Sequence, residues 1–227
     1  MYNLEYYNTI KNDKSMFLIT GCSGFIGYHI TKNFLESGHK VIGIDSLNSY
    51  YSVDLKKDRL KELKKFNLFN FYKLDLSKIT QLKKLKSELK KVRYVIHLAG
   101  QAGVRYSIVN PYSYIDDNIK AHLNLLEIFK EKKIDLFIYA SSSSIYGNNK
   151  NNLNPESFYA VTKKTIEDMS YVYHRIYNIN FIGLRFFTVY GSWGRPDMFV
   201  YKFIEKCLQN KVIDIYNFGN HKRSFTH

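Results

Sequence analysis

The sequence predicts a doubly wound α/β protein with a parallel sheet and an incomplete second lobe. Short apolar runs rich in β-branched residues alternate with longer stretches of helical period, and a glycine-rich turn follows the first apolar run. Every apolar run is separated from the next by a crossover long enough to make neighbouring strands parallel. Because such crossovers are right-handed, the loops after the strands gather at one sheet edge, where we expect a ligand.

The first βαβ unit carries the pattern most clearly. Residues 16–20 (MFLIT) are typical of a buried strand, residues 25–37 have apolar side chains at helical spacing, and residues 40–45 (KVIGID) predict the second strand. Lysines alternate with leucines in the polar stretches 54–66 and 81–91. This alternation indicates solvated helix faces, including the face that carries Lys57 and its neighbours.

The same alternation continues along the chain and predicts four more strands. We expect these strands at 69–76, 94–100, 136–144 and 181–187. The intervening helices are a Lys-rich helix before residue 94, a long helix within 112–133 and a helix at 157–177. After Phe187 the pattern changes to a helix at 197–209, a strand at 212–218 and a turn at Gly219 and Asn220. We therefore divide the chain into an N-terminal extension (1–15), a nucleotide-binding domain (16–190) and the start of a truncated substrate lobe (191–227).

Composition sets the class of protein and its surroundings. The chain has 227 residues, 45% of them hydrophobic, which is typical of a compact globular protein. Cys22 and Cys207 make no disulfide framework, no apolar stretch approaches the length of a membrane span, and residues 1–15 lack the core of a secretory signal. We expect a cytoplasmic protein without a membrane partner. The net charge of +14 comes with neither a nucleic-acid-binding motif nor a basic block, so we expect no nucleic-acid partner.

A glycine-rich turn follows the first predicted strand and precedes the first helix. Gly21 permits a tight turn, Gly24 allows the backbone to approach a pyrophosphate, and Gly27 allows the helix to pack on the strand. The helix start, with Phe25 and Ile26, then presents backbone N–H groups to phosphate oxygens. The position between a strand and a helix favours a dinucleotide site over an ordinary turn.

Further cofactor residues are expected at the ends of the next strands. Asp45 ends the second strand, where a carboxylate accepts both ribose hydroxyls of the adenosine half and favours NAD over NADP. Asp75, beside Leu76, is placed to bind adenine, although a helix N-cap near residue 77 explains it equally well. Leu98 and Ala99 close the fourth strand beside the pyrophosphate. The preceding residue, His97, is interpreted as a buried core histidine.

Tyr159 and Lys163 are four residues apart on a predicted helix and therefore share one face. A neighbouring ammonium lowers the pKa of a phenol and converts tyrosine into a usable base. This spacing is common by itself. Its meaning comes from the nucleotide turn upstream and from the serines at 141–144, which end the preceding strand at the same sheet edge.

These motifs together resemble the extended short-chain dehydrogenase/reductase family, with its Rossmann fold. The resemblance spans nearly the whole chain and is carried by TGCSGFIG (20–27), SSSSIYG (141–147) and YAVTK (159–163). Longer stretches look like UDP-glucuronate 4-epimerases: DSLNSYY (45–51), GQAGVRYS (100–107) and GLRFFTVYGSWGRPDM (183–198). The resemblance implies NAD as cofactor, a UDP-sugar as substrate and no metal. It also implies a homodimer through the helices at 112–133 and 157–177.

The resemblance further implies roles for individual residues. Tyr159 is the base, Lys163 the ribose ligand and phenolate stabiliser, and Ser142 the hydroxyl that binds the sugar 4-oxygen, with Asn118 supporting the site. The implied reaction takes the 4-hydroxyl proton and the carbon-4 hydride, lets the 4-keto sugar turn, and returns hydride to its opposite face. For a uronic acid the carboxylate must be held out of line with the new carbonyl, so that carbon dioxide is not lost.

Substrate-binding residues are implied around the same edge. Ser143, Ser144, Thr188 and Arg195 supply hydroxyls and a guanidinium suited to a carboxylate, although Arg195 also fits a surface arginine beside a proline turn. The loop residues Arg105 and Arg223 are further candidates for the diphosphate or the sugar acid. Related dehydratases and decarboxylases carry an acid in the segment that here reads Ser142-Ser143-Ser144, so its absence favours epimerisation.

The sequence also departs from the family pattern. Family members run on for about another hundred residues, the loop before Tyr159 is shorter than usual, and Ser192 and Ser224 replace a usual Pro and Asp. We therefore predict that the protein epimerises a nucleotide sugar at carbon 4. The leading candidate reaction converts UDP-glucuronate to UDP-galacturonate. The alternatives are a UDP-glucose 4-epimerase, a sugar-nucleotide dehydratase and an NAD-binding module without turnover.

Overall fold

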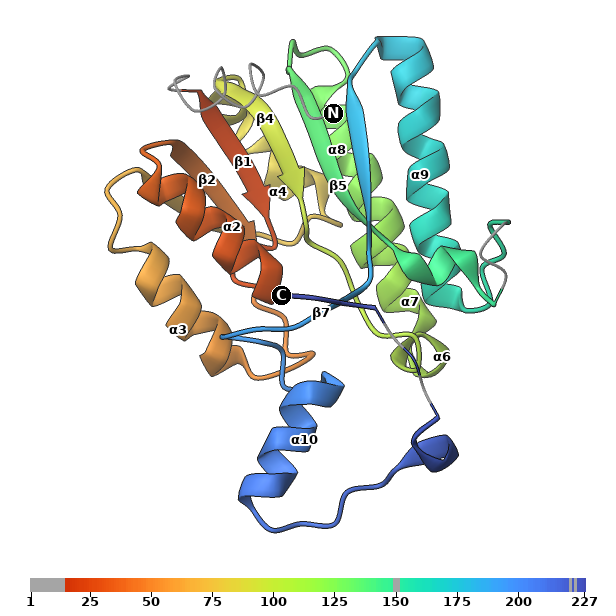
Figure 1. Ribbon diagram of the computed structural model, residues 1–227. Helices are drawn as coiled ribbons and strands as arrows, with labels where there is room; N and C mark the ends of the chain where they lie inside the picture. The colour runs from red at the N-terminus through yellow and green to blue at the C-terminus, as the bar shows by residue number, and fades with distance from the viewer. Residues whose placement is uncertain (1–14, 149–151, 221, 223) are drawn as a thin grey trace.

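A single six-stranded parallel sheet forms the centre of the protein, as the sequence predicts (Figure 1). The computed structural model describes residues 15–148, 152–220, 222 and 224–227. The strand order is β3-β2-β1-β4-β5-β6, so the direction of winding reverses between β1 and β4. The strands are β1 (Met16–Thr20), β2 (Lys40–Asp45), β3 (Phe69–Lys73), β4 (Val92–His97), β5 (Leu136–Ser142) and β6 (Phe181–Phe186).

Helices cover both faces of this sheet. One layer contains α2 (Phe25–Glu36) and α3 (Val53–Leu63), and the other contains α4 (Ile79–Lys83), α5 (Lys86–Leu89), α8 (Ala121–Phe129) and α9 (Phe158–Tyr177). Successive side chains of a strand point to opposite faces, so Phe17 packs in the cluster under α2 while Leu18 packs in the cluster under α8. Both faces of β1, β2, β4 and β5 are buried, which explains why these strands read as continuous apolar runs.

Capping side chains define where the main helices begin. Ser52 precedes α3 and accepts a hydrogen bond from the Leu55 N–H at 3.2 Å. Ser157 precedes α9 and accepts from the Ala160 N–H at 3.1 Å. The helix then continues to Tyr177 and ends at Asn178, which has a left-handed φ of 53°. These caps fix the position of α9 and hence of the residues in its first two turns.

Two predicted helices have a different form from the one expected. The Lys-rich stretch 81–91 does not make one helix, because α4 ends at Lys83 and α5 begins at Lys86. The stretch within 112–133 comprises α7 (Pro111–Tyr114), a π-helical turn η1 (Ile115–Lys120) and α8, after a short helix α6 (Tyr106–Val109). A π-helical turn shifts the register of side chains along a helix.

The C-terminal part lies across the carboxyl edge of the sheet. Thr188–Val189 (β7) pairs in parallel with Phe225–Thr226 (β8), and α10 (Phe199–Leu208) lies below the sheet in Figure 1. The prediction of a strand at 212–218 was wrong: residues 212–215 have no regular structure and a 3₁₀ turn η3 spans Tyr216–Gly219. Val212 and Ile215 are 83% and 73% exposed. Strand formation depends on a neighbouring strand and a face to bury, and the described chain supplies neither here.

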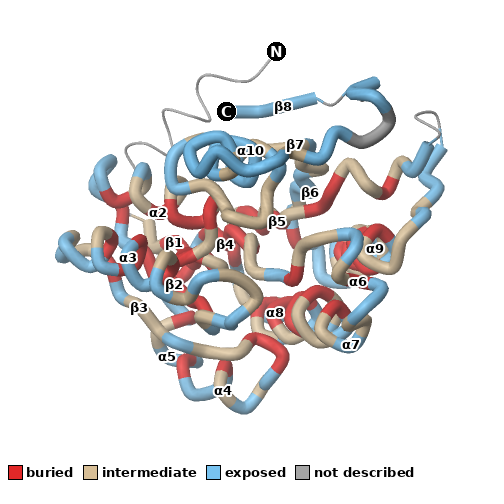
Figure 2. Tube along the Cα trace, turned by 90° about the horizontal axis from the view of Figure 1, so that it is seen from below, coloured by how far each residue is buried: buried red, intermediate tan, exposed pale blue. Residues whose placement is uncertain are grey.

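The sheet and the C-terminal segments also differ in how far they are buried. Viewed from below the sheet, the buried segments lie in the strands and the facing helices, whereas α10 and β8 are exposed (Figure 2). Cys22 is buried in the sheet region and Cys207 is exposed on α10, and both are free thiols. Within the described residues, no helix combines the length and the apolar character that crossing a bilayer requires.

Candidate active site

A cavity of about 270 Å³ lies at the carboxyl edge of the sheet, where the winding reverses. It is bordered by the turn after β1, the ends of β2, β4 and β5, the first two turns of α9, and residues 186–198. This is the edge at which doubly wound sheets bind ligands. All the residues expected to bind a cofactor line it: Gly21, Gly24, Phe25, Ile26, Gly27, Asp45, Asp75, Leu76, Leu98, Ala99, Tyr159 and Lys163.

The glycine-rich turn has no room for side chains. Gly21 has a φ of +70°, and a β-carbon there would lie 2.7 Å from the backbone nitrogen of Ala99. A β-carbon at Gly27 would lie 2.0 Å from the Gly21 carbonyl oxygen. Gly24 is the N-cap of α2 and provides no capping side chain, so the N–H groups of the first turn remain available at the cavity. This cradle fits the pyrophosphate of a dinucleotide.

Asp45 is buried at the end of β2 beside this turn. Its Oδ2 accepts from the Ser23 N–H at 3.0 Å and its Oδ1 from the Leu47 N–H at 2.8 Å. Burial raises the pKa of Asp45, while these hydrogen bonds and the nearby lysine act in the opposite direction. A carboxylate oxygen accepts more than one hydrogen bond, so both oxygens keep capacity for the hydroxyls of a ribose.

Asp75 lines the cavity, and its carboxylate is also hydrogen-bonded to Ser77. Its Oδ1 accepts from the Ser77 N–H at 2.9 Å and from the Ser77 hydroxyl at 2.7 Å. It is not a helix N-cap, because α4 begins at Ile79 with Lys78 at the N-cap. His97, by contrast, is a core residue as interpreted: it is 2% exposed, its Nδ1 is 2.7 Å from the Thr20 hydroxyl, and burial holds its pKa well below the usual range.

The three residues expected to be catalytic come together in this cavity. Ser142 ends β5, and Tyr159 and Lys163 lie in the first two turns of α9. The Ser142 hydroxyl and the Tyr159 phenol share a hydrogen bond. The Lys163 Nζ donates to the Ala140 carbonyl at 2.8 Å and lies 5.9 Å from the centre of the Tyr159 ring. A hydroxyl, a phenol and an amine therefore share one enclosed space, as proton transfer requires.

The expected effect of Lys163 on Tyr159 was wrong for the protein alone. Burial raises the pKa of Tyr159, whereas the hydrogen bond to Ser142 and the charge of Arg195 act in the opposite direction. The Lys163 ammonium is directed to the Ala140 carbonyl, and the same burial lowers its own pKa to about 8. Spacing on a helix predicts that the two side chains are neighbours, but burial decides the direction of the Tyr159 pKa, and the Lys163 ammonium is not among the groups that lower it.

Lys163→Met should stabilise the protein at pH 7. Below pH 8 the native state carries a buried ammonium, and between pH 8 and ~10.4 the unfolded chain binds more protons, so wild-type stability rises with pH. The substitution removes a desolvation cost of roughly 3 kcal/mol and also removes about 1 kcal/mol of stabilisation from the hydrogen bond to Ala140. The free energy of unfolding should therefore rise by about 1–2 kcal/mol. Urea unfolding at pH 7, 8, 9 and 10 measures the difference, which should shrink above pH 8.

Lys57→Met is the control for this series, because Lys57 is on the same type of amphipathic helix but its side chain is 62% exposed. Lys57→Met should change the stability by no more than about 0.5 kcal/mol. A Lys163→Met protein that is less stable than the wild type at pH 7, or a gap independent of pH, would contradict the burial argument.

The loop after β4 is held against α9 by buried polar side chains. Asn118, in the π-helical turn, accepts from the Gln101 N–H at 2.8 Å and donates to the Thr162 hydroxyl at 3.0 Å. Tyr114 donates to the carbonyls of Ala102 and Gly103. Residues 100–102 line the cavity, so these contacts shape its wall. Asn118 thus lies where a supporting residue was expected.

The residues expected to bind the substrate are more scattered. Arg195 lines the main cavity and its side chain is 22% exposed, so it is not a surface arginine beside a proline turn. Thr188 and Arg195 both line a smaller adjoining cavity of about 90 Å³. Ser143 and Ser144 do not line the main cavity, but the Ser144 N–H and hydroxyl donate to the Ser142 hydroxyl at 3.2 and 2.9 Å.

Two further arginines were expected near the substrate, and the structure describes only one of them. Arg105 is exposed in the turn before α6 and does not line the cavity, which corrects the expectation that it contacts a ligand there. The loop after β4 turns the following residues outward once Tyr114 has anchored Ala102 and Gly103. Arg223 lies outside the described residues.

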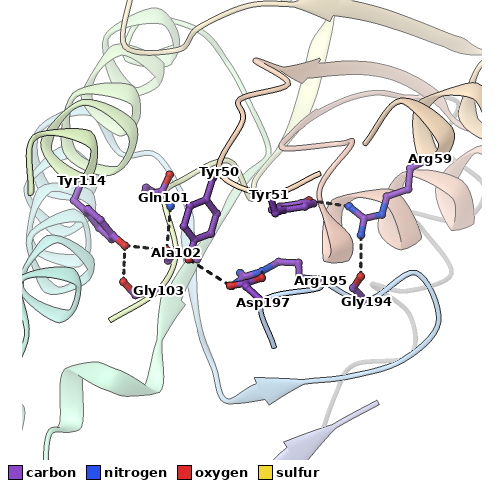
Figure 3. Close-up of polar contacts among 10 residues, drawn as sticks. All are labelled: Tyr50, Tyr51, Arg59, Gln101, Ala102, Gly103, Tyr114, Gly194, Arg195 and Asp197. Carbon is purple, nitrogen blue, oxygen red and sulfur yellow. Dashed lines mark hydrogen bonds and ion pairs between the residues drawn. The ribbon is translucent and has the colours of Figure 1, made fainter. Parts of the chain in front are cut away.

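A second set of polar residues, which the sequence pattern did not predict, lies around the cavity (Figure 3). Lys57 is exposed as expected, but Lys56 and Arg59 of the same helix are buried, so α3 does not have a uniformly solvated lysine face. The Arg59 guanidinium donates to the Ser23 carbonyl at 3.0 Å and the Gly194 carbonyl at 3.3 Å. A signal existed, because Lys56 and Arg59 fall in helical register with the buried Leu60 and Leu63.

Two adjacent tyrosines connect the loop after β2 to residues 193–197. The Tyr51 hydroxyl accepts from Arg59 at 2.8 Å, and the Tyr50 hydroxyl donates to Asp197 at 3.3 Å. Asp197 also pairs with Arg195. Tyr50, Tyr51 and Arg195 line the cavity, so this connection crosses its mouth (Figure 3).

Comparison with known proteins gives one consistent family. The family model described as "NAD dependent epimerase/dehydratase family" matches residues 17–227. Protein CapI of Staphylococcus aureus is 49% identical over 92% of the chain, and a UDP-glucuronate 4-epimerase of Thermodesulfobacterium geofontis is 42% identical over 93%. The crystal structure of UDP-glucuronic acid 4-epimerase from Bacillus cereus, in complex with UDP-glucuronic acid and NAD, superposes with a TM-score of 0.86 at 35% identity over 93% of the chain.

The chain is shorter than these similar proteins. It spans 65% of the length of CapI, 67% of the T. geofontis epimerase and 68% of the B. cereus chain. The matched part contains the cavity, the glycine-rich turn and the first two turns of α9.

Proposed function

Because the chain belongs to the NAD-dependent epimerase/dehydratase family, we propose that it binds NAD⁺ and epimerises a nucleotide sugar at carbon 4. The observation that carries the proposal is the meeting of Ser142, Tyr159 and Lys163 in the cavity that the glycine-rich turn also borders. A proton-transfer group thus stands beside a cradle for a dinucleotide pyrophosphate. Asp45, on the adenosine side, favours NAD over NADP because its charge repels a 2′-phosphate.

The glycine-rich turn and Asp45 would hold NAD⁺, which would supply a reversible acceptor for the hydride of sugar carbon 4. The chain's own residues handle the proton and the position of the sugar. Tyr159 takes the 4-hydroxyl proton and later gives it back, while Ser142, already hydrogen-bonded to Tyr159, orients the 4-oxygen. Lys163 supplies a positive charge near the phenol when a ribose hydroxyl draws it from Ala140, which lowers the barrier to deprotonation. Inversion at carbon 4 would require the sugar to present its opposite face before Tyr159 returns the proton.

UDP-glucuronate is the substrate that these observations favour, with UDP-galacturonate as the product. The similar proteins from T. geofontis and B. cereus are named for this sugar nucleotide. Arg195 borders the cavity with a guanidinium suited to a carboxylate. The segment Ser142-Ser143-Ser144 has no acid that would repel a uronate or assist elimination. UDP-glucose epimerisation and dehydration are the competing reactions within the same class.

The test is a product analysis with purified protein, NAD⁺ and UDP-glucuronate. We expect UDP-galacturonate by chromatography, with no release of carbon dioxide and no net NADH. Turnover of UDP-glucose alone would replace the proposed substrate with a neutral sugar. A 4-keto-6-deoxy product would indicate a dehydratase.

A second candidate function is an NAD-binding module without turnover. It is favoured by the burial of Tyr159, which raises the pKa of the phenol away from that of a usable base. It predicts that NAD⁺ raises the melting temperature of the protein while no sugar nucleotide gives a product. Any turnover would eliminate it.

We further infer a homodimer through α7, α8 and α9, which pack against one another. Tyr112, Leu123, Val172 and Ile176 on these helices are exposed, which is unusual for so many large apolar side chains on adjacent helices. Light scattering after gel filtration should give a dimer for the wild type and a monomer for the double variant Val172→Arg, Ile176→Arg. Leu208→Arg, on the exposed side of α10, is the matched control and should stay dimeric. A monomeric wild type would contradict the inference.

A further inference from the structure

Arg195 and Asp197 lie in one tight turn at the cavity. The Met198 N–H donates to the Arg195 carbonyl at 3.2 Å, which closes a β-turn with Pro196 in its second position. Proline fixes the backbone angle there, so the turn has little freedom. The side chains of Arg195 and Asp197 are therefore held at a fixed separation before any ligand binds.

The two side chains form a bidentate ion pair. The Arg195 Nε donates to Asp197 Oδ1 at 2.9 Å, and Nη2 donates to Oδ2 at 2.6 Å. A guanidinium has five N–H groups, and this pair uses one on Nε and one on Nη2. The second bidentate edge, formed by Nη1 and the other Nη2 hydrogen, is left for a ligand. Arg195 borders both the main cavity and the smaller one.

Asp197 is also held from the opposite side of the cavity mouth. The Tyr50 hydroxyl donates to Asp197 Oδ2 at 3.3 Å (Figure 3). The Tyr50 ring also packs on Tyr106, with ring centres 5.0 Å apart. The carboxylate thus joins the loop after β2 to the turn that carries Arg195. This contact limits how Asp197, and with it the guanidinium, can rotate.

The ion pair is charged on both sides at neutral pH. Burial opposes ionisation of Asp197, but the hydrogen bonds from Arg195 outweigh it and hold the pKa of Asp197 below its usual range. Burial likewise opposes the charge of Arg195, and Asp197 outweighs it and raises the pKa of Arg195. Because the pair has no net charge, it attracts an anion only weakly at a distance. An anion bound here is stabilised mainly by directed hydrogen bonds from Arg195.

We propose that Asp197 is a positioning residue that aims the Nη1–Nη2 edge of Arg195 at an anionic group of the nucleotide sugar. The proposal rests on the function proposed above, because it assumes that a nucleotide sugar enters this cavity. Diphosphate oxygens and a uronate carboxylate offer the same planar pair of acceptors to a guanidinium. Asp197 does not touch the substrate in this arrangement and acts only through Arg195.

The test measures binding of sugar nucleotides to the full chain saturated with NAD⁺. Calorimetry gives the Kd of UDP-glucuronate and of UDP-glucose for the wild type, Asp197→Ala and Asp197→Asn. Asp214→Ala is the matched control, since Asp214 also pairs with a basic side chain, Lys206 at 3.4 Å, but on an exposed surface. The NAD⁺ affinity and the melting temperature of each variant are measured in parallel.

Asp197→Ala should raise the Kd of UDP-glucuronate about tenfold or more, by analogy with the loss of one partner of a desolvated charge pair. Asp197→Asn should recover part of this loss, because its amide oxygen still accepts from Arg195. NAD⁺ affinity and the Asp214→Ala protein should be unchanged. A loss confined to UDP-glucuronate identifies the carboxylate as the anion that Arg195 binds, and an equal loss for both sugars identifies the diphosphate.

An unchanged or lower Kd in Asp197→Ala would overturn the proposal. A parallel loss of NAD⁺ affinity and melting temperature would also overturn it, since that result indicates a structural role. Wild-type protein that binds neither sugar nucleotide would overturn it as well. Failure of the proposed function is a separate result: the wild type would bind UDP-glucuronate without forming an epimerised product, and the comparison of Kd values would still stand.

Discussion

Tyr159→Phe should lower the rate of epimerisation by about 10²–10⁴-fold without weakening the binding of NAD⁺. The substitution removes only the phenolic oxygen, which is the proposed proton acceptor and the hydrogen-bond partner of Ser142. The ring itself remains and keeps its edge-to-face contact with Tyr114, whose ring centre is 6.0 Å away. Initial rates of UDP-galacturonate formation, with NAD⁺ affinity measured by calorimetry, give both quantities.

Tyr173→Phe is the matched control for that experiment. Its hydroxyl donates to Glu127 on the surface, 2.5 Å away, so the same chemical change is made far from the cavity. It should leave the rate unchanged. A Tyr159→Phe enzyme with wild-type rate would show that another group carries the proton, and the proposed mechanism would have to be abandoned.

Gly21→Ala should abolish NAD⁺ binding and destabilise the fold by about 4 kcal/mol or more, which is exceptional for one substitution. The left-handed φ of +70° is unfavourable for alanine by roughly 1–2 kcal/mol. The remainder comes from backbone contacts, because the new β-carbon would lie 2.7 Å from the Ala99 nitrogen and 2.9 Å from the Leu98 carbonyl carbon. Neither atom can move without disturbing the end of β4. Thermal unfolding and calorimetry with NAD⁺ measure the two effects.

Gly38→Ala separates the two causes. Gly38 has a φ of +84°, but a β-carbon there would have nothing within 4 Å. Its substitution should therefore cost only the conformational part, roughly 1–2 kcal/mol, and leave NAD⁺ affinity intact. Equal losses for Gly21→Ala and Gly38→Ala would show that backbone strain, and not close packing of the turn on β4, explains the requirement for glycine at position 21.

The sequence was sufficient for the sheet and for the group of residues around its carboxyl edge. Parallel strands that alternate with helices have few allowed arrangements, so the apolar runs and the crossovers predict a doubly wound parallel sheet. The positions of Ser142, Tyr159 and Lys163 follow from the same logic, since strand ends and helix starts meet at one edge. These inferences depend on periodicity and spacing, which a single sequence displays directly.

What the sequence could not provide depends on contacts between distant segments. Arg59 belongs to a stretch with the composition of a solvated helix face, yet it is fully buried because its guanidinium reaches carbonyl groups of two other segments. Likewise, the apolar pattern at 212–218 predicts a strand, but a strand needs a partner to pair with. The protonation of Tyr159 depends on the balance of burial against hydrogen bonds, and spacing contains no information about that balance.

Side chains of opposite charge hold the backbone of Ser23 on both sides of its α-carbon: Asp45 accepts from its N–H, and Arg59 donates to its carbonyl. Its orientation is therefore settled when the chain folds and not when a dinucleotide arrives. Immobilising a flexible loop upon association consumes part of the affinity that the contacts would otherwise provide. A preorganised turn avoids that loss, and it also means that weakening either anchor should slow or weaken cofactor capture even though neither anchor needs to touch the phosphates.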